Sequence, residues 1–472
     1  MNIDTAMVEK LVQRVLGELS ATGSATAQPG STAVSDGIFT DMNAAVSAAA
    51  KGQKDYLNCT MADRRRFVAA IRAIVTKPEN LQIMAERAVE ETGMGNARDK
   101  YIKNKYAAEL SPGVEDLETG AWSGDDGLTT VEYSAFGIIG AICPTTNPTE
   151  TLICNTIGML AAGNSVVFSP HPRAKGVSVW LVQLINSALA AEGAPANLVV
   201  TVGEPSIAST QAMMEHPAVR MLVVTGGPGI VDLVLKSGKK AIGAGAGNPP
   251  VVVDATANLE KAARDIVSGS SFDNNLPCIA EKEVLVVDSV ADTLILHMKK
   301  SGAYEVRDAE TVAKLVAQLI TPKGGLAVDW MGKSAVAILA GLGIEAPADT
   351  RLVIVQTDKD HPFVQHELMM PVLPIVRVKD VDEAIDLAVV LEHGYRHTAC
   401  MHSQDVSKLT KMARMIQTTI FVKNGPSYAG IGIGGEGYCS FTIAGPTGEG
   451  ITSARSFARR RRCVLVGDLN VR

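Results

Sequence analysis

Cys278 has the surroundings expected of a covalent nucleophile. It ends the polar loop Ser270-Ser-Phe-Asp-Asn-Asn-Leu-Pro-Cys278, between an expected helix over residues 259–268 and an expected strand over residues 284–288. A loop position gives the sulphur access to a substrate, and the thiolate is the reactive form of a cysteine. Position alone does not establish this role, because a loop cysteine is more often inert.

Asn147 is a candidate for stabilising negative charge during such a reaction. It belongs to the loop Pro144-Thr-Thr-Asn-Pro148, which follows an expected strand over residues 137–143 and opens an expected helix over residues 149–162. A side-chain amide and the free backbone N–H groups of a helix start can both donate hydrogen bonds to an oxyanion. The alternative is an ordinary Asn-Pro turn.

Three other patterns have simpler structural interpretations. Residues 430–435 resemble a dinucleotide-binding fingerprint in their letters, but glycines and a proline follow within residues 445–448, so no helix can open there. The glycine-rich residues 243–247 precede a strand, the wrong order for a phosphate loop, and indicate a flexible segment where backbone approaches a ligand. The arginines 459–462 are typical of a solvated or intersubunit edge.

Composition narrows the class of protein. A chain of 472 residues with 46% hydrophobic residues predicts two or three domains with substantial cores, and a net charge of −6 favours neither nucleic acid nor an anionic membrane as partner. The seven cysteines lack paired spacing, which indicates reduced thiols in the cytosol rather than disulfides or zinc. His361, His366 and Glu367 lack metal-ligand spacing, so no metal is expected.

The pattern of elements predicts an α/β protein. Helical periodicity dominates residues 41–110, and from residue 136 short apolar runs alternate with helical segments. Such alternation predicts parallel strands covered by helices, and a second alternating series over residues 259–422 predicts a second α/β domain. The expected strands of the first series are residues 137–143, 165–168, 198–202, 221–224 and 251–254, and its helices are residues 149–162, 175–191, 206–215 and 229–235.

Taken together, these motifs resemble the aldehyde dehydrogenase superfamily, specifically its coenzyme A-acylating branch found in bacterial microcompartments. The resemblance runs from about Asp36 to the C-terminus and rests on several motifs in the right order. They are residues 142–148, 167–172, 224–228, the Cys278 loop, 366–371 and 448–455.

The resemblance implies roles for individual residues. Cys278 would be the nucleophile, Asn147 the oxyanion donor, and Glu367 the contact to the nicotinamide ribose. His397 is a weaker candidate for assisting thiol deprotonation, with a structural role as the alternative. The cofactor cleft would be lined by Thr145, Ser169, Pro170, Gly203, Thr225 and Gly226. NAD is expected and NADP stays open, because Ser169 and Pro172 stand where many members carry Lys and Glu.

One departure from the family points to acyl transfer. Hydrolytic members use a glutamate to activate water, and Ala244 stands at the corresponding position here. Alanine cannot act as a base, whereas a thiol acceptor needs less help to ionise. The expected reaction is oxidation of a short-chain aldehyde to its acyl-CoA through a thioester on Cys278, with propionaldehyde preferred over acetaldehyde. The alternatives are a hydrolytic aldehyde dehydrogenase and a non-catalytic microcompartment cargo protein.

The expected fold is aldehyde dehydrogenase-like, with a Rossmann-type cofactor domain, an α/β catalytic domain and an oligomerisation arm. The cofactor domain would comprise residues 36–120 and 136–248, and the catalytic domain residues 249–454. The arm would combine residues 121–135 and 455–472 and join the chain into a homodimer or homotetramer.

The first 19 residues predict a docking element. Apolar residues from Met7 to Leu19 recur at three- and four-residue spacing and share one helical face, and residues 20–35 have the composition of a linker. The resemblance implies an encapsulation peptide that binds a microcompartment shell or cargo protein. It thereby implies a location in the bacterial cytoplasm, inside a microcompartment.

Deleting residues 1–19 is expected to abolish association with shell proteins and to leave enzyme activity unchanged. Burying the apolar stripe on a partner can supply a few kcal/mol, enough for weak docking. Exchanging Leu11 and Leu16 for Glu should have the same effect, because both lie on that stripe. A pull-down with shell proteins beside a coenzyme A-dependent assay measures both properties. Equal association by all three proteins would contradict the docking role.

Overall fold

The computed structural model describes residues 33–34 and 36–469. The chain divides into a unit of residues 1–33 and a unit of residues 34–472, and the account below concerns the second. The predicted helix over residues 1–19 and nearly all of the linker after it lie outside the described residues.

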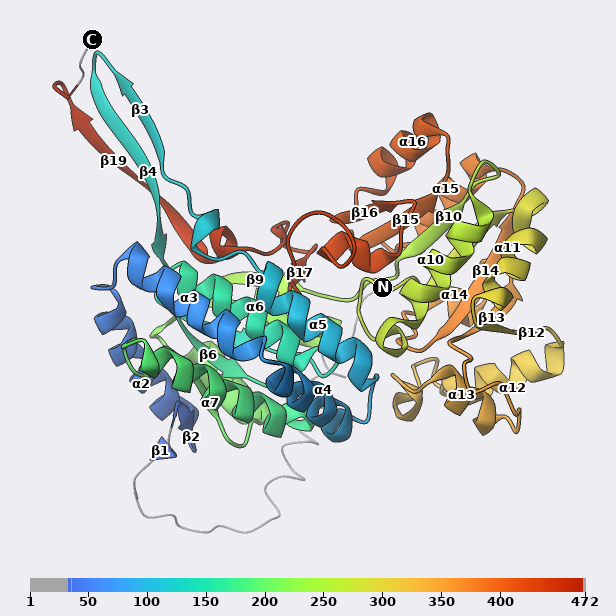
Figure 1. Ribbon diagram of the computed structural model, residues 1–472, viewed down its shortest axis with the longest axis horizontal. Helices are drawn as coiled ribbons and strands as arrows, with labels where there is room; N and C mark the ends of the chain where they lie inside the picture. Colours follow the sequence, from blue (N-terminus) through green and yellow to red (C-terminus); the bar gives the residue numbers. More distant parts are fainter. Residues whose placement is uncertain (1–32, 35, 470–472) are drawn as a thin grey trace, which may run out of the picture. The chain divides into compact units, whose positions relative to one another are not determined.

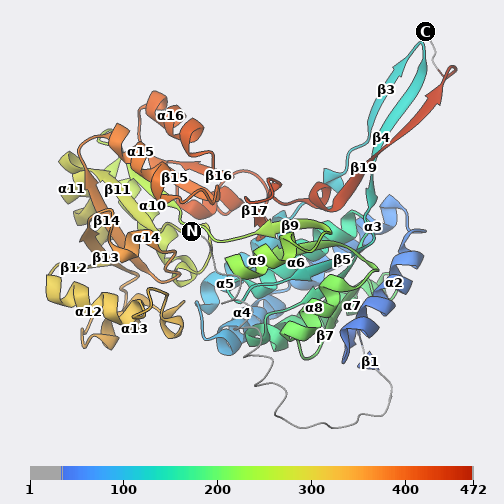
Figure 2. The same ribbon diagram turned by 180° about the vertical axis from the view of Figure 1, so that it is seen from behind.

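A seven-stranded sheet organises the first half of this unit (Figures 1 and 2). Its strand order is β1-β2-β7-β6-β5-β8-β9, and the pairs from β2 to β9 are parallel. The strands are β1 (Ala33–Val34), β2 (Ile38–Phe39), β5 (Ile138–Ile142), β6 (Ser165–Ser169), β7 (Val199–Val202), β8 (Val219–Thr225) and β9 (Lys240–Ala244). The central strands are buried along their whole length, which explains why they appear in the sequence as continuous apolar runs.

Helices cover both faces of this sheet. Alternate strand residues such as Ile139 and Phe168 pack against α3, α6 and α7, while Ile142 and Val167 face the core shared with α2, α8 and α9. The helices of this region are α2 (Met42–Tyr56), α3 (Met61–Val75), α4 (Pro78–Thr92), α5 (Ala97–Leu110), α6 (Pro148–Ala161), α7 (Lys175–Ala191), α8 (Ile207–Glu215) and α9 (Pro228–Leu235). By length and composition, residues 172–191 pass as a membrane span, as the core helix of a soluble protein also does.

A second parallel sheet has the strand order β12-β13-β14-β11-β10-β15-β16. Its strands are β10 (Pro250–Val253), β11 (Glu283–Val287), β12 (Ala303–Val306), β13 (Leu352–Thr357), β14 (Val372–Val378), β15 (Thr398–His402) and β16 (Ile420–Lys423). The helices of this region are α10 (Leu259–Ser271), α11 (Asp288–Lys300), α12 (Ala309–Leu319), α13 (Ala335–Gly341), α14 (Pro362–Gln365), α15 (Val381–Leu391) and α16 (Val406–Ile416). The α/β architecture predicted from the sequence is therefore confirmed.

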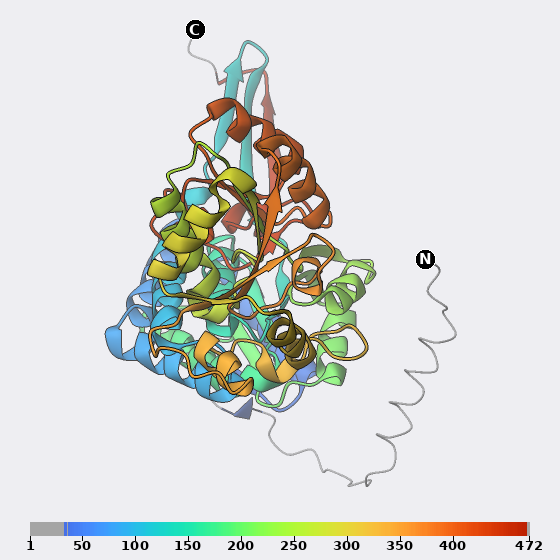
Figure 3. The ribbon, with the colours of Figure 1, turned by 90° about the vertical axis from the view of Figure 1, so that its right-hand side faces the viewer.

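A three-stranded antiparallel sheet extends beyond the helices that cover the first sheet (Figures 1 to 3). It consists of β3 (Gly120–Gly124), β4 (Gly127–Ala135) and β19 (Ala458–Val466), and every residue of β19 pairs with one of β4. We call these three strands the arm.

The structure differs from one sequence-based expectation. Residues 243–247 were expected to be a flexible segment, but Gly243 and Ala244 end the edge strand β9, paired with β8. In the segment after β16, Thr442 donates a hydrogen bond to Asn155 of α6 (3.1 Å) and bonds Thr225 of β8 (3.0 Å). This segment therefore packs on the first sheet. Docking of an irregular segment depends on contacts distant in sequence, which no local pattern reveals.

Candidate active site

The expected cofactor residues meet at one edge of the first sheet. Thr145 follows the carboxyl end of β5, Ser169 ends β6, Gly203 follows β7 and Thr225 ends β8. The chain passes from β5 to β6 and β7 on one side and then to β8 and β9 on the other, so β5 and β8 flank the point where strand order reverses. Ligands of open α/β sheets bind at this point.

The edge leaves room for a ligand. A Cβ atom at Gly203 would meet nothing closer than 3.8 Å, and one at Gly227 or Gly229, at the start of α9, would meet nothing within 4 Å. Ser169 is buried, and its hydroxyl is bonded to that of Thr210 (2.7 Å). The arrangement fits a nicotinamide cofactor. No group of three His, Cys, Asp or Glu side chains among the described residues can hold a metal ion.

Cys278 follows a turn with unusual backbone geometry. Asp273, Asn274 and Asn275 all have positive φ, at 47°, 55° and 65°. Asp and Asn tolerate this left-handed region because their short polar side chains bond locally. Asn275 Nδ2 donates to the carbonyls of Ser270 (2.8 Å) and Glu281 (3.0 Å), which closes the turn. The turn ends α10 and leads to Cys278, which is half-buried against the core.

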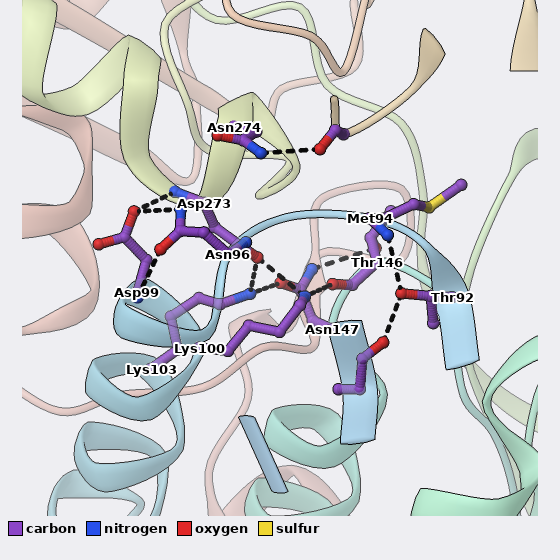
Figure 4. A network of polar contacts seen from close by, with 12 residues as sticks. Thr92, Met94, Asn96, Asp99, Lys100, Lys103, Thr146, Asn147, Asp273 and Asn274 are labelled. Carbon is purple, nitrogen blue, oxygen red and sulfur yellow. Dashed lines mark hydrogen bonds and ion pairs between the residues drawn. The ribbon is translucent and has the colours of Figure 1, made fainter. Parts of the chain in front are cut away.

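A buried cluster of charges surrounds this turn (Figure 4). Asp273 Oδ2 accepts from Lys100 Nζ (3.0 Å) and Lys103 Nζ (2.6 Å), and Lys103 also pairs with Glu150 Oε1 (2.9 Å). All four side chains are fully buried. We call Lys100, Lys103, Glu150 and Asp273 the buried ion cluster. Charges in such a position persist only when each finds partners.

Asn147 lies beside the buried ion cluster, at the residue before α6. Its Oδ1 accepts a hydrogen bond from Lys103 Nζ (2.6 Å), and its Nδ2 donates to Thr146 Oγ1 (3.1 Å). The side chain of Asn147 makes no capping bond to the helix. Its amide group therefore forms hydrogen bonds within the site and does not cap the N-terminus of α6.

The backbone carbonyl of Cys278 and the ring of His397 both lie close to Gly247. A Cβ atom at position 247 would lie 2.8 Å from the Cys278 carbonyl oxygen and 2.9 Å from Cγ of His397, so glycine is required there. His397 is buried, its Nδ1 bonds Thr398 Oγ1 (2.9 Å), and its Nε2 has no partner among the described residues. Burial, followed by the charge of Lys282, lowers the pKa of His397 to about 4, so the imidazole is neutral at pH 7.

Charges of opposite sign near the thiol shift its pKa in opposite directions. Burial, and then the nearby Glu367 carboxylate, raise the pKa of Cys278 to about 12, while Lys282 and Lys103 oppose the rise. Burial also raises the pKa of Glu367 to about 7, against the effects of Lys282 and of a hydrogen bond from the Gly247 backbone. A thiol with this pKa reacts at neutral pH only if a nearby base removes its proton. Neutral His397 and Glu367 are the candidates.

Lys282 holds the turn of residues 273–275, which we call the nucleophile turn because it leads to Cys278. Its Nζ donates to Asn275 Oδ1 (2.6 Å) and to the Asn275 carbonyl (3.0 Å), and its side chain is buried. Burial lowers the pKa of Lys282, and the neighbouring Glu367, Cys278 and Glu281 oppose that shift. The ammonium thus stabilises both the turn and the thiolate form of Cys278.

Sequence reasoning missed Lys282 and the buried ion cluster. Lysines on an otherwise amphipathic helix resemble a solvated face, and Asp273 resembles any loop aspartate. One signal existed: Lys100, Lys103 and Ala107 follow each other at three- and four-residue spacing, so the two lysines continue the buried stripe of α5. A charge on an apolar stripe indicates a buried partner elsewhere in the chain.

Comparison with known proteins gives a consistent result. Residues 25–438 match the model of the Aldehyde dehydrogenase family. The chain is 51% identical to a propanal dehydrogenase (CoA-propanoylating) of Salmonella typhimurium over 100% of both chains.

Two solved structures extend this similarity. The structure of Rhodopseudomonas palustris propionaldehyde dehydrogenase with bound CoA and an acylated cysteine is 64% identical, with a TM-score of 0.92, and the match covers 93% of this chain and 100% of that one. A propionaldehyde dehydrogenase from the Clostridium phytofermentans fucose utilisation bacterial microcompartment is 51% identical, with a TM-score of 0.90 and coverages of 92% and 100%.

Replacing Lys282 with Met is expected to slow alkylation of Cys278 by iodoacetamide about tenfold at pH 8, because one pKa unit changes the thiolate fraction tenfold. The pKa of Cys278 should rise, since a positive charge that favours the thiolate is lost. Peptide mass spectrometry against pH measures the rate at Cys278 separately from the exposed Cys463. The exposed Lys236 exchanged for Met is the control. A folded variant with an unchanged pH profile would contradict the role of Lys282.

Proposed function

This chain belongs to the aldehyde dehydrogenase family, and we propose that it oxidises propionaldehyde to propionyl-CoA through a thioester on Cys278. The observation that carries the proposal is the close approach of the Cys278 backbone carbonyl and the His397 ring to Gly247, together with alanine at position 244. This arrangement supports the neutral imidazole of His397 as a base in the same site, and position 244 offers no carboxylate to activate water. It therefore favours a thiol over water as the acyl acceptor.

The first chemical step is attack of the Cys278 thiolate on the aldehyde carbon. The carbonyl oxygen becomes an oxyanion, which the Asn147 side-chain amide and the Cys278 backbone N–H stabilise by hydrogen bonds. The buried charge of Lys282 favours the thiolate before attack. Glu367 takes the thiol proton.

A nicotinamide cofactor, NAD or NADP, supplies the hydride acceptor when it is bound at the carboxyl edge of the first sheet. Thr145, Ser169, Pro170, Gly203, Thr225 and Gly226 would hold it there, and Glu367 would contact its ribose. Oxidation leaves the acyl group on the Cys278 sulphur as a thioester.

Transfer to coenzyme A completes the reaction. The coenzyme A thiol loses its proton and attacks the thioester carbon, and Cys278 leaves as a thiolate. We assign the proton acceptor to His397, because its imidazole is neutral and its Nε2 has no other partner among the described residues. At position 244 the alanine methyl group is buried at the end of β9 and cannot take a proton from water.

The proposal also includes assembly and location. Two exposed apolar side chains, Trp122 and Val464, form a row on one face of the arm with Thr129 between them, since both pair in register with Thr129. A second copy of the chain covering this row would form a homodimer or homotetramer. We assign the enzyme to a bacterial microcompartment, with residues 1–19 as the element that binds shell or cargo protein.

Without coenzyme A, the enzyme is expected to produce about one reduced cofactor per Cys278 and then stall, because the thioester has no acceptor. Cys278→Ala should give no burst. His397→Gln should keep the burst but lower the coenzyme A-dependent rate by roughly 10²–10⁴-fold, the usual scale for losing a general base. Stopped-flow absorbance of the reduced cofactor measures both phases.

Each alternative function predicts a different trace. A hydrolytic enzyme would continue past one turnover without coenzyme A, and a non-catalytic cargo protein would give no signal with it. Either result would contradict the proposed reaction. Loss of the burst itself in His397→Gln would instead assign His397 to the first half-reaction or to the fold.

Exchanging Trp122 and Val464 for Glu is expected to convert the oligomer to a monomer, because charges would replace an apolar row buried by a second copy. Light scattering after size exclusion measures the mass. Val390→Glu is the matched control, since Val390 is 67% exposed but lies on α15, away from the arm. A monomeric wild type, or a double variant of unchanged mass, would contradict the role of the arm.

A further inference from the structure

We propose that Lys103 is a positioning residue that orients the Asn147 amide toward the reacting carbonyl and holds the turn before Cys278 with the same ammonium group. This inference rests on the proposed function, because it assigns to Lys103 the task of aiming the oxyanion donor. Lys103 itself contacts no reacting atom in this assignment.

The first argument is the chemistry of the Lys103–Asn147 contact. An ammonium group has three hydrogen-bond donors and no acceptor, so it can bond the oxygen of an amide but not its nitrogen. Lys103 Nζ lies 2.6 Å from Asn147 Oδ1. The Asn147 Nδ2 is therefore directed away from Lys103, and this N–H group is the one able to stabilise an oxyanion. If Lys103 is removed, neither of the two amide orientations is excluded.

The second argument is that Lys103 has three specific oxygen partners. Its Nζ donates a hydrogen bond to Asn147 Oδ1 and forms ion pairs with Glu150 Oε1 (2.9 Å) and Asp273 Oδ2 (2.6 Å). Burial lowers the pKa of Lys103, but Asp273 and Glu150 outweigh that effect and raise it overall, so the side chain stays charged. A buried ammonium group with one hydrogen bond and two ion pairs is held in place by all three partners.

The third argument is that the same ammonium group reaches the nucleophile turn. Asp273 lies five residues before Cys278. Besides the contact of its Oδ2 with the lysines, its Oδ1 accepts a hydrogen bond from the Asn96 backbone N–H (2.8 Å), and its own N–H donates to Asp99 Oδ2 (2.8 Å). Figure 4 shows the side chains of Lys103, Asn147 and Asp273 converging. One ammonium group thus contacts both the side chain of the proposed oxyanion donor, Asn147, and the turn that leads to Cys278.

Lys100 provides a matched control from the same helix. It is equally buried, and it bonds the same Asp273 oxygen (3.0 Å). Its other contact is the Thr146 backbone carbonyl (3.2 Å), not the Asn147 side chain. Loss of either lysine disturbs the buried ion cluster, but only loss of Lys103 releases the amide.

The test is a double-mutant cycle on the burst rate with aldehyde and cofactor. Asn147→Ala should lower this rate by roughly 10²–10³-fold, and Lys103→Met by about 10²-fold, the scale of a small misplacement. The double variant Lys103→Met/Asn147→Ala should have a burst rate within about threefold of that of Asn147→Ala alone. Once the amide is absent, loss of Lys103 cannot misdirect it. The fold-reductions in burst rate caused by Lys100→Met and by Asn147→Ala should instead multiply in the double variant.

Two further variants separate positioning from stability. Asn147→Asp keeps an acceptor for Lys103 and should keep the melting temperature, yet it should lose the burst rate as Asn147→Ala does, because it has no N–H to donate. Lys103→Gln serves if Lys103→Met does not fold. Its side chain offers both a donor and an acceptor, so it should lower the maximal burst rate with little change in the half-saturating aldehyde concentration.

The outcomes distinguish the two proposals. If the effects of Lys103 and Asn147 variants multiply as those of Lys100 and Asn147 do, Lys103 does not position the amide and the inference fails. If both Asn147 variants keep the wild-type burst rate, the oxyanion role in the proposed function fails instead.

Discussion

A single buried carboxylate, that of Asp273, connects the parts of this active site. It accepts hydrogen bonds from two lysines of α5 and from the backbone at the start of that helix, and it belongs to the turn that leads to Cys278. Removing one member of such a cluster leaves an uncompensated charge in a dry interior, which is strongly destabilising. The cluster therefore determines where α5, α6 and the nucleophile turn stand relative to one another.

The left-handed turn at residues 273–275 depends on that constraint. Three successive non-glycine residues with positive φ would be unstable in isolation. Here Asp273 is held by Lys100 and Lys103, Asn274 donates to the Gly332 carbonyl (2.8 Å), and Asn275 is held by Lys282. Gly332 in turn accepts from the Gly95 backbone and donates to the Met369 carbonyl, two residues beyond Glu367. The backbone strain at the nucleophile is thus compensated from several directions.

The electrostatics of the site follow from the same burial. Buried surroundings keep His397 neutral and raise the pKa values of Cys278 and Glu367, while Lys282 limits the last two shifts. A neutral imidazole and a carboxyl group with a pKa of about 7 can both accept protons at neutral pH. They suit a reaction that moves one proton at the thiol and another at coenzyme A. At position 244 the side chain is a buried methyl group, which cannot act as a base.

Local patterns in the sequence determined the secondary structure and indicated candidate reactive residues. Apolar runs alternating with amphipathic helices predict parallel sheets because burial on both faces demands them, and Cys278 and Asn147 stand out by their loops and motifs. Only the tertiary structure decided the surroundings of those residues. Lys100 and Asp273 are 173 residues apart, and the environment of a lysine depends on whether a carboxylate from elsewhere in the chain meets it. The periodicity of α5 places Lys103 on the buried face, but it carries no information about Asp273 or Asn147. A charged side chain is costly to bury alone and stable when paired, so its role is decided by long-range packing that a local pattern cannot encode.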